Sequence, residues 1–359
     1  MTTRPSARVT LLLLATAAAA GSLECGGIAI VEPPRGDAGA ACTAGLGDCD
    51  QSPSNGCETD LTSDAQHCGA CGHGCQGGHC QSARCQAIVL AQGQAAAYRL
   101  AVDETHVYWT LGAKGIIARV PITGGQPETF ASSQNGPADV AVQGGQVYWV
   151  NAGDGTVQRA PAAGGATTQI AAGQGQAWSI AVVAGTVIWN DEQSGAVRKL
   201  GPGDAAPTTL STAPGSWAVA ADEHRAYWTQ LGPGDVLFAP LAGGAPVTLA
   251  SNLGGPQAIA VSGDSVFFTL NGAGSVESVP RLGGVVTILS SEGGDALAVD
   301  SDNVYFGAHD GRLLRVPRAG GSATTLALGT APATSIALDA TSVYWTAADT
   351  SGLISRVAK

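Results

Sequence analysis

Residues 107–125, VYWTLGAKGIIARVPITGG, decide the fold of this chain, because similar segments follow six more times at a nearly constant interval. The residue pair that marks each segment begins as Tyr108-Trp109 and returns after 40, 40, 39, 40, 38 and 39 residues, as Tyr148-Trp149, Ile188-Trp189, Tyr227-Trp228, Phe267-Phe268, Tyr305-Phe306 and Tyr344-Trp345. A period of about 40 residues with four short strands per unit is the signature of a propeller blade. The sequence therefore predicts an all-β, seven-bladed β-propeller.

Each unit contains four strand-like runs. In the sixth unit they are DALAVD (295–300), NVYFGA (303–308), RLLRVP (312–317) and TTLALG (324–329), bounded by Gly, Asp, Asn or Pro. Short runs between such turn residues are typical of strands. Because side chains alternate across a strand, one residue of each marker pair is expected to pack between blades and the other to face the opposite way, both as core residues.

The two ends of the repeat predict how the ring closes. The last unit ends after its third strand, GLISRVAK (352–359), and the missing fourth strand has a match in AIVLAQG (87–93), which precedes the first unit. We expect this N-terminal strand to pair beside residues 353–357 and to close the propeller, which removes the exposed edges of an open sheet. The predicted propeller spans residues 86–359.

The first 41 residues have the pattern of an export and processing region. Arg4 and Arg8 precede an apolar run at 9–20 that is too short to span a membrane, so residues 1–24 are expected to be a signal peptide. Cys25 follows at once. It is either a lipidation site, or a cysteine removed with the signal or left unpaired. Residues 25–41, with Pro33-Pro34 and several Gly and Ala, are expected to form a flexible tether.

Residues 42–85 form a cysteine-rich module with few large apolar side chains, so cross-links must supply its order. Four disulfides are expected, with their connectivity open. The alternative is a metal site, because His67, His73 and His79 are interleaved with a Cys-x-x-Cys pair. Export to an oxidising compartment favours disulfides. The eight cysteines are Cys42, Cys49, Cys57, Cys68, Cys71, Cys75, Cys80 and Cys85.

Two stretches resemble known families. DCDQSPSNGCETDLTSDAQHCGACGHGC (48–75) resembles a cysteine-rich leader module of exported bacterial cell-surface proteins, which implies an exposed or secreted location. The pattern VYWT…G-x-I-x-R-V-P-x-x-GG, over residues 87–359, is similar to the YWTD repeats of receptor ectodomains and to bacterial TolB-like propellers. Those families have six blades, and their Asp after YWT is absent here: Thr110 precedes Leu111 and Thr229 precedes Gln230. The resemblance implies the fold and a habit of interaction.

The composition and charge of the chain limit the classes of binding partner that we expect. The chain has 359 residues, 13% of them charged, with a formal net charge of −11 and no Lys/Arg cluster. A nucleic acid or an anionic membrane surface is therefore not an expected partner. Membrane contact is expected only through a lipid at Cys25, and the protein is expected to be a monomer.

Candidate site residues are those that depart from the repeat. Trp178 and Trp217 open the inner strands of blades three and four, where other blades carry Tyr98, Ala138, Gln257, Asp295 and Thr334. They are predicted either to stack on a sugar, an aromatic group or a peptide side chain, or to plug the central channel. Tyr98 is included among the candidate ligand-binding residues.

A second group of candidates lies in the loops between second and third strands. Asp191, Glu192, His309 and Asp310 are predicted to face the funnel mouth. Each acid, like Asp154, Asp235 and Asp349, also occupies a turn position that favours Asp by backbone hydrogen bonding alone. The turn interpretation is preferred over a divalent-metal site, and the sequence contains no catalytic motif of the kinds that mark hydrolases or nucleotide-binding loops.

These observations predict an exported or surface-displayed, non-catalytic binding propeller for a protein or glycan ligand, without a cofactor. Its location would be secreted, or the outer surface or periplasm of a bacterial cell. One alternative is a metal-dependent hydrolase or lyase that uses Asp191, Glu192, His309 and Asp310 in the funnel. Another is a purely structural surface protein.

Overall fold

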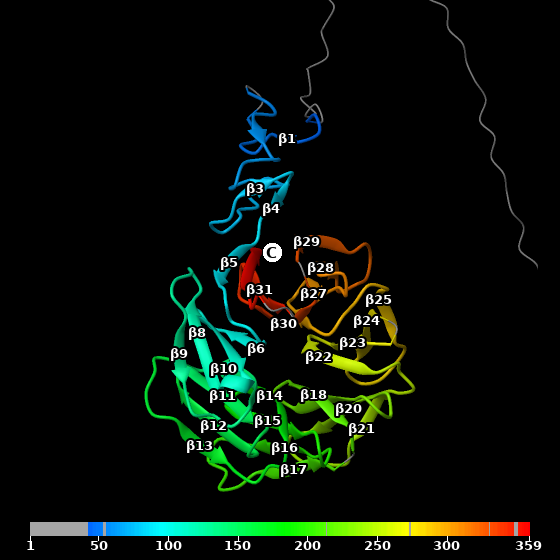
Figure 1. Ribbon diagram of the computed structural model, residues 1–359. Coiled ribbons are helices and arrows are strands. Elements are labelled where there is room, and N and C mark those ends of the chain that lie inside the picture. Colours follow the sequence, from blue (N-terminus) through cyan, green and yellow to red (C-terminus); the bar gives the residue numbers. More distant parts are fainter. Residues whose placement is uncertain (1–41, 53–54, 213, 273, 330, 348–350) are drawn as a thin grey trace, which may run out of the picture. The chain divides into compact units, whose positions relative to one another are not determined.

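A computed structural model describes residues 42–359 except 53–54, 213, 273, 330 and 348–350 (Figure 1). The described residues belong to one compact unit. The predicted signal peptide (1–24), the tether (25–41) and Cys25 lie outside the described residues. Among the residues described, no helix has the length and apolar character needed to cross a membrane.

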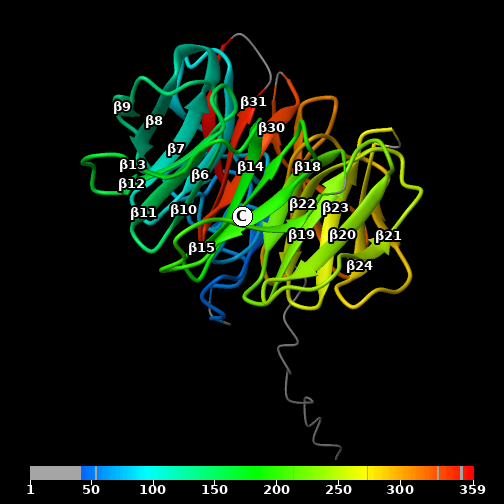
Figure 2. The same ribbon diagram turned by 90° about the horizontal axis from the view of Figure 1, so that it is seen from below.

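Seven four-stranded antiparallel sheets form the propeller predicted from the repeat (Figures 1 and 2). Blade 1 contains β6 (Ala97–Val102), β7 (His106–Leu111), β8 (Ile116–Pro121) and β9 (Glu128–Ala131), with the 3₁₀ turn η1 (Gly112–Lys114). Blade 2 contains β10 (Pro137–Gln143), β11 (Gln146–Asn151), β12 (Thr156–Pro161) and β13 (Thr168–Ala171). Blade 3 contains β14 (Ala177–Val183), β15 (Thr186–Asp191), β16 (Val197–Leu200) and β17 (Thr208–Ser211).

Blades 4 to 6 repeat the same order. Blade 4 contains β18 (Ser216–Ala221), β19 (Arg225–Gln230), β20 (Asp235–Pro240) and β21 (Val247–Ala250). Blade 5 contains β22 (Pro256–Ser262), β23 (Ser265–Leu270), β24 (Ser275–Pro280) and β25 (Thr287–Ser290). Blade 6 contains β26 (Leu297–Val299), β27 (Asn303–Gly307), β28 (Arg312–Pro317) and β29 (Thr324–Leu328). In the Pro-x-x-Gly-Gly turn that joins third and fourth strands, both glycines of blade 1 have positive φ, 87° at Gly124 and 146° at Gly125. Other residues rarely adopt these angles.

The seventh blade confirms the predicted closure. It contains β30 (Ala333–Leu338), β31 (Ser342–Ala347) and β32 (Ile354–Ala358), and its fourth strand is β5 (Ile88–Ala91) from the N-terminal side of the ring. β5 pairs antiparallel with β32, so that Ala91 lies opposite Ile354 and Val89 opposite Ser355. Figure 1 shows the cyan β5 beside the red strands of the last blade. Leu90 points into the core, with 3% of its surface exposed, whereas Val89 is 50% exposed.

The marker pairs of the repeat build the core between blades. Each interface holds the first residue of one pair and the second residue of the pair in the next blade, as Tyr108 and Trp149 do between blades 1 and 2. The other six interfaces contain Tyr148 with Trp189, Ile188 with Trp228, Tyr227 with Phe268, Phe267 with Phe306, Tyr305 with Trp345, and Tyr344 with Trp109. The side chain predicted to face the opposite way thus packs against the other neighbouring blade.

Four blades share a contact between a carboxylate and a tyrosine at the turn after the inner strand. Oδ1 of Asp103 accepts hydrogen bonds from the backbone N–H groups of Thr105 and His106, and Oδ2 accepts one from the Tyr108 hydroxyl at 2.9 Å. The equivalent pairs are Tyr227 with Asp222, Tyr305 with Asp300, and Tyr344 with Asp339, at 2.7, 2.9 and 2.6 Å.

These contacts shift the pKa of both partners. Burial raises the pKa of each aspartate, but the hydrogen bonds outweigh burial, so the pKa lies below 3.8 in all four and reaches about 2 in Asp300. Burial and the neighbouring carboxylate raise the pKa of Tyr108, Tyr227 and Tyr344 to about 12.

We expect acid to weaken the propeller through these aspartates. A pKa lowered by folding means that the unfolded chain binds more protons, so the stabilisation is complete above about pH 4 and is lost as the pH falls toward about 2. Asp300→Asn removes roughly one proton from the difference in bound protons between the unfolded and the folded chain. Urea unfolding at several pH values should therefore give a smaller slope of unfolding free energy against pH for the variant, and equal slopes would contradict the assignment.

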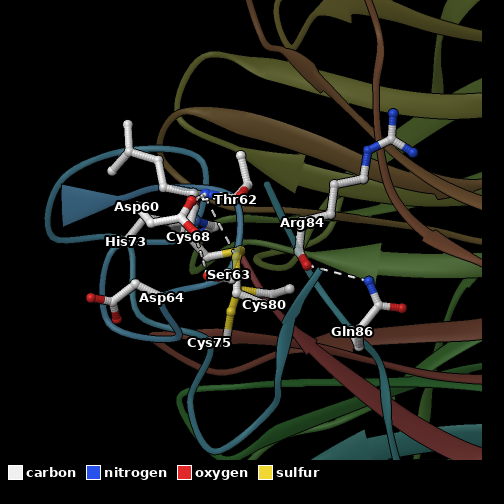
Figure 3. Close-up of a disulfide and its surroundings, with 12 residues drawn as sticks. Asp60, Thr62, Ser63, Asp64, Cys68, His73, Cys75, Cys80, Arg84 and Gln86 are labelled. Atoms are coloured by element: carbon white, nitrogen blue, oxygen red, sulfur yellow. Dashed lines mark hydrogen bonds between the residues drawn. A yellow bond between two sulfur atoms is a disulfide. The ribbon is translucent and has the colours of Figure 1, made fainter. Parts of the chain in front are cut away.

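The cysteine-rich module contains the four expected disulfides: Cys42–Cys57, Cys49–Cys71, Cys68–Cys80 and Cys75–Cys85. Its strands are two short hairpins, β1 (Leu46–Gly47) with β2 (Thr59–Asp60), and β3 (Cys80–Gln81) with β4 (Arg84–Cys85). Figure 3 shows the Cys68–Cys80 bond beside the Asp60 turn, where Asp60 accepts hydrogen bonds from Thr62 and Ser63.

The disulfides argue against the alternative metal site. Cys49, His67 and Cys71 converge, as do Cys68, Cys75 and Cys85, but every one of these sulfurs is in a disulfide and is not available as a thiolate ligand. Several disulfides in one short module favour an extracellular or otherwise oxidising compartment.

The module packs against the last two blades. Four of its cysteines share a core cluster with Tyr305, Trp345 and Val357. The Nε2 atom of His73 lies 2.7 Å from the backbone oxygen of Lys359, and Nη2 of Arg356 donates to the backbone oxygen of Gln76 at 2.8 Å. The module is therefore anchored next to the strand pair that closes the ring.

Candidate binding site

Three aromatic rings meet where the inner strands begin, at one end of the central channel. The ring centroids of Tyr98 and Trp178 are 5.9 Å apart, and those of Trp178 and Trp217 are 5.4 Å apart. The rings come from blades 1, 3 and 4. Blade 2 carries the small Ala138 at this position, which leaves space for Tyr98 and Trp178 to meet. We call Tyr98, Trp178 and Trp217 the aromatic trio. All three side chains keep part of their surface exposed.

The residue after the marker pair fixes the backbone of this region. The buried Oγ1 of Thr110 accepts a hydrogen bond from the backbone N–H of Arg99 at 3.2 Å and donates to the backbone oxygen of Ala138 in the next blade at 3.4 Å. In blade 4, Thr229 links Ala218 to Gln257 in the same way. In blade 3, Asn190 replaces the threonine and donates to the backbone oxygen of Trp217 at 3.1 Å.

Tyr98 is held from two sides. Its backbone oxygen accepts hydrogen bonds from the hydroxyl groups of Thr334 and Thr346, at 3.1 and 3.2 Å. Its ring lies 4.8 Å from the guanidinium carbon of Arg99, a cation–π contact worth about 0.5–2 kcal/mol. The Nη1 atom of Arg99 also donates to the backbone oxygen of Thr334 at 3.2 Å.

An apolar pocket of about 540 Å³ adjoins the trio. Tyr98 and Trp178 form its aromatic walls, Pro137 and Ala138 belong to blade 2, and the remaining lining consists of Ala and Gly residues with Thr334. None of the described residues that line it carries a charged side chain. Ligand sites in proteins are concave and mostly apolar, with a few polar groups. The pocket therefore suits an uncharged ring or an apolar side chain.

Asp191, one of the predicted funnel acids, shapes its own turn. Its carboxylate accepts hydrogen bonds from the backbone N–H groups of Gln176 and Gln193 and from the Ser194 hydroxyl, and lies 3.6 Å from Nη1 of Arg198. Burial raises the pKa of Asp191, but these donors outweigh burial and leave it below the ordinary value. The contacts match the turn interpretation that the sequence analysis preferred.

The other predicted loop residues are Glu192, His309 and Asp310. Asp310 forms an ion pair with Nε of Arg312 at 2.7 Å, and Arg312 also pairs with Glu292. His309 lies near Gly274 of the neighbouring blade. Burial raises the pKa of Glu192. Within the described part of the chain, the groups of three side chains that converge for a metal include none of Asp191, Glu192, His309 and Asp310, and Asp349 lies outside the described residues.

Arg99 is not among the site residues predicted from the sequence. It directly follows Tyr98, and the equivalent positions of other blades hold Asp139, Ser179 and Ser335, or Ala218, Ala258 and Ala296. The sequence does contain a signal for it, because Arg99 occupies an inner-strand position at which the other blades carry a small or an acidic residue.

Comparisons with known proteins agree on the fold. No protein-family model matches the chain, and no curated protein matches it. The virginiamycin B lyase from Staphylococcus aureus is similar with a TM-score of 0.65 at 11% identity, over 76% of this chain and 98% of that one. A structure of the nidogen/laminin complex gives a TM-score of 0.50 at 19% identity, over 60% of this chain and 90% of the other.

The third similar structure is PorZ, a bacterial surface component of the type-IX secretion system of Porphyromonas gingivalis. Its TM-score is 0.58 at 16% identity, over 75% of this chain and 37% of PorZ. At these identities the similarity shows a shared propeller fold, and a propeller fold hosts many unrelated functions.

Proposed function

We propose that this chain is an exported or surface-displayed, non-catalytic binding propeller whose protein or glycan ligand docks on the aromatic trio. The observation that carries the proposal is the contact of three rings from blades 1, 3 and 4 beside an apolar pocket of about 540 Å³. The blade repeat does not require these rings, since four other blades place Ala, Gln, Asp or Thr at the same position. Trp and Tyr, with Arg, are the side chains most enriched at binding hot spots.

The location belongs to the same proposal. Four disulfides within residues 42–85 favour an oxidising compartment. The export pattern at 1–24 and the leader-like module support a secreted protein or one displayed on the outer surface or in the periplasm of a bacterial cell, with Cys25 as a possible site of lipid attachment. Mass spectrometry of the mature N-terminus tests the fate of Cys25: a diacylglyceryl cysteine at the first position supports the anchor, and cleavage beyond Cys25 rules it out.

We expect the trio to carry the binding energy. Loss of a buried aromatic anchor commonly costs 2 kcal/mol or more, which is about a 30-fold loss of affinity. A screen of glycans and envelope proteins identifies a ligand, and titration then compares the wild type with Trp178→Ala and Trp217→Ala. Val285→Ala is the control, because Val285 is 83% exposed and lies in the turn between β24 and β25 of blade 5.

The outcomes separate the proposal from its alternatives. A purely structural protein predicts that Trp178→Ala and Trp217→Ala leave every affinity unchanged. A metal-dependent hydrolase or lyase predicts a stoichiometric divalent ion that is lost in Asp310→Ala, which elemental analysis of the purified protein measures. Asp191 and Asp310, two of the three acids such an enzyme would use, contact Ser194 and Arg312 respectively.

A further inference from the structure

The central channel contains a ring of equivalent backbone amides below the aromatic trio. In each blade one inner-strand residue lies opposite the second residue of the marker pair: Leu100, Val140, Ile180, Val219, Ile259, Leu297 and Ile336. All seven line one cavity of about 180 Å³. One buried water needs on the order of 10–15 Å³ on this measure, so the cavity has room for a small molecule.

In blades 1 to 4 a side chain supplies the acceptor for this amide. The backbone N–H of Leu100 donates to Oγ of Ser335 at 3.0 Å, and that of Val219 donates to Oγ of Ser179 at 3.3 Å. The carboxylate of Asp139 serves two amides, those of Val140 at 2.8 Å and Ile180 at 3.1 Å.

In blades 5 to 7 the acceptor is missing. An acceptor for these three amides would have to come from the blade before each of them. Those blades, 4, 5 and 6, carry Ala218, Ala258 and Ala296 at the position where blades 7, 2 and 3 carry Ser335, Asp139 and Ser179. No side chain within the described part of the chain accepts a hydrogen bond from the equivalent amides of Ile259, Leu297 and Ile336. Backbone N–H groups away from bulk water need an acceptor.

Arg99 adds a positive charge to the same cavity. Its guanidinium group is drawn toward blade 7 by the backbone oxygen of Thr334, and it forms no ion pair within 4.0 Å with any described carboxylate, Asp139 included. The Asp139 carboxylate is committed to the amides of Val140 and Ile180 and to the Ser179 hydroxyl. The Asp139 carboxyl lines the same cavity as Arg99, and the Arg99 charge acts on it without a direct ion pair. The three open amides therefore lack an acceptor, while Arg99 is bonded to the backbone oxygen of Thr334.

We propose that the channel binds a small anion, a carboxylate or an inorganic oxyanion or halide, between Arg99 and the amides of Ile259, Leu297 and Ile336. Converging backbone N–H groups and a guanidinium group are the donors that proteins use for such anions. The site adjoins the aromatic trio, because Arg99 contacts the ring of Tyr98, but its existence does not depend on the ligand proposed for the trio.

Two measurements test the site. Crystals soaked in sodium bromide are expected to show an anomalous peak in the channel beside Arg99. Calorimetric titration of the folded protein with sodium acetate, and separately with inorganic phosphate, at constant ionic strength near pH 7, is expected to show saturable binding of at least one of them. The two titrations distinguish a carboxylate site from a phosphate site.

Matched variants make the test specific. Arg99→Met keeps the stem beside Tyr98 and removes the charge, and we expect it to weaken binding tenfold or more. Ala296→Ser places a hydroxyl where Ser179 and Ser335 serve their neighbouring amides, so it should satisfy the Ile336 amide and weaken binding several-fold. Arg84→Met, which removes an exposed charge from the module, should leave binding unchanged.

The proposal is overturned if the wild type shows neither a channel peak nor saturable binding, or if Arg99→Met binds as tightly as Arg84→Met. Should Arg99→Met fail to fold, Ala296→Ser decides: unchanged affinity in that variant contradicts the role of the open amides.

Discussion

Leu90→Asp is expected to lower the free energy of unfolding by about 4 kcal/mol or more, because it places an unpaired carboxylate in the core between the first and last blades. Leu90 is 3% exposed and packs in a cluster with Trp109, Tyr344 and Ile354. Its strand, β5, is the only one in its sheet that comes from the N-terminal side of the ring. The substitution therefore acts on the contact that closes the propeller.

Val89→Asp is the matched control for Leu90→Asp. It makes the same chemical change in the same strand, one residue away, but Val89 is 50% exposed and its side chain faces the other side of the sheet. We expect a loss of less than about 1 kcal/mol. Urea unfolding of the two purified variants gives both values. Equal losses would mean that β5 does not hold Leu90 in the core.

Reduction of the disulfides is expected to unfold the module while the ring stays folded. Four disulfides close loops of 10 to 22 residues in a segment with almost no apolar core, and each native disulfide typically contributes about 2–5 kcal/mol to a small domain. The propeller contains no cysteine, and its core lies between blades, so a reductant has no bond to break there.

Limited proteolysis measures this difference. With dithiothreitol present, cleavage should fall within residues 42–85 and leave a resistant fragment that begins just before β5. Without the reductant the module should resist as well. A reduced sample in which the ring is digested as fast as the module would show that the contacts of Cys68, Cys75, Cys80 and Cys85 with the last blades are essential to the propeller.

The architecture could be predicted because every blade repeats the same physical requirement. A marker pair such as Tyr108-Trp109 must fill two interfaces at once, so it recurs with the period of the fold, and the unmatched strands at the two ends of the repeat identify the closure. The number of disulfides followed from counting. Their pairing did not, because it depends on which sulfurs a coreless loop brings together.

The site was only partly predictable, for two physical reasons. Trp178 and Trp217 were visible as departures from the repeat, but the contact of Trp178 with Tyr98 depends on the small Ala138 of the blade between them. An Asp that orders a turn and an Asp that binds a metal have the same local sequence, so Asp191 could be assigned only from its donors. The open amides of the channel were invisible, since a missing acceptor is a relation between neighbouring blades.

The central claim is that β5 closes a ring of seven blades, and amide hydrogen exchange of the native protein tests it most directly. We predict that the ladder amides of β5 exchange as slowly as those of β32, its partner, because both should open only with the whole ring. Exchange of the β5 amides as fast as in an exposed loop, while β32 and the inner strands stay protected, would contradict the account.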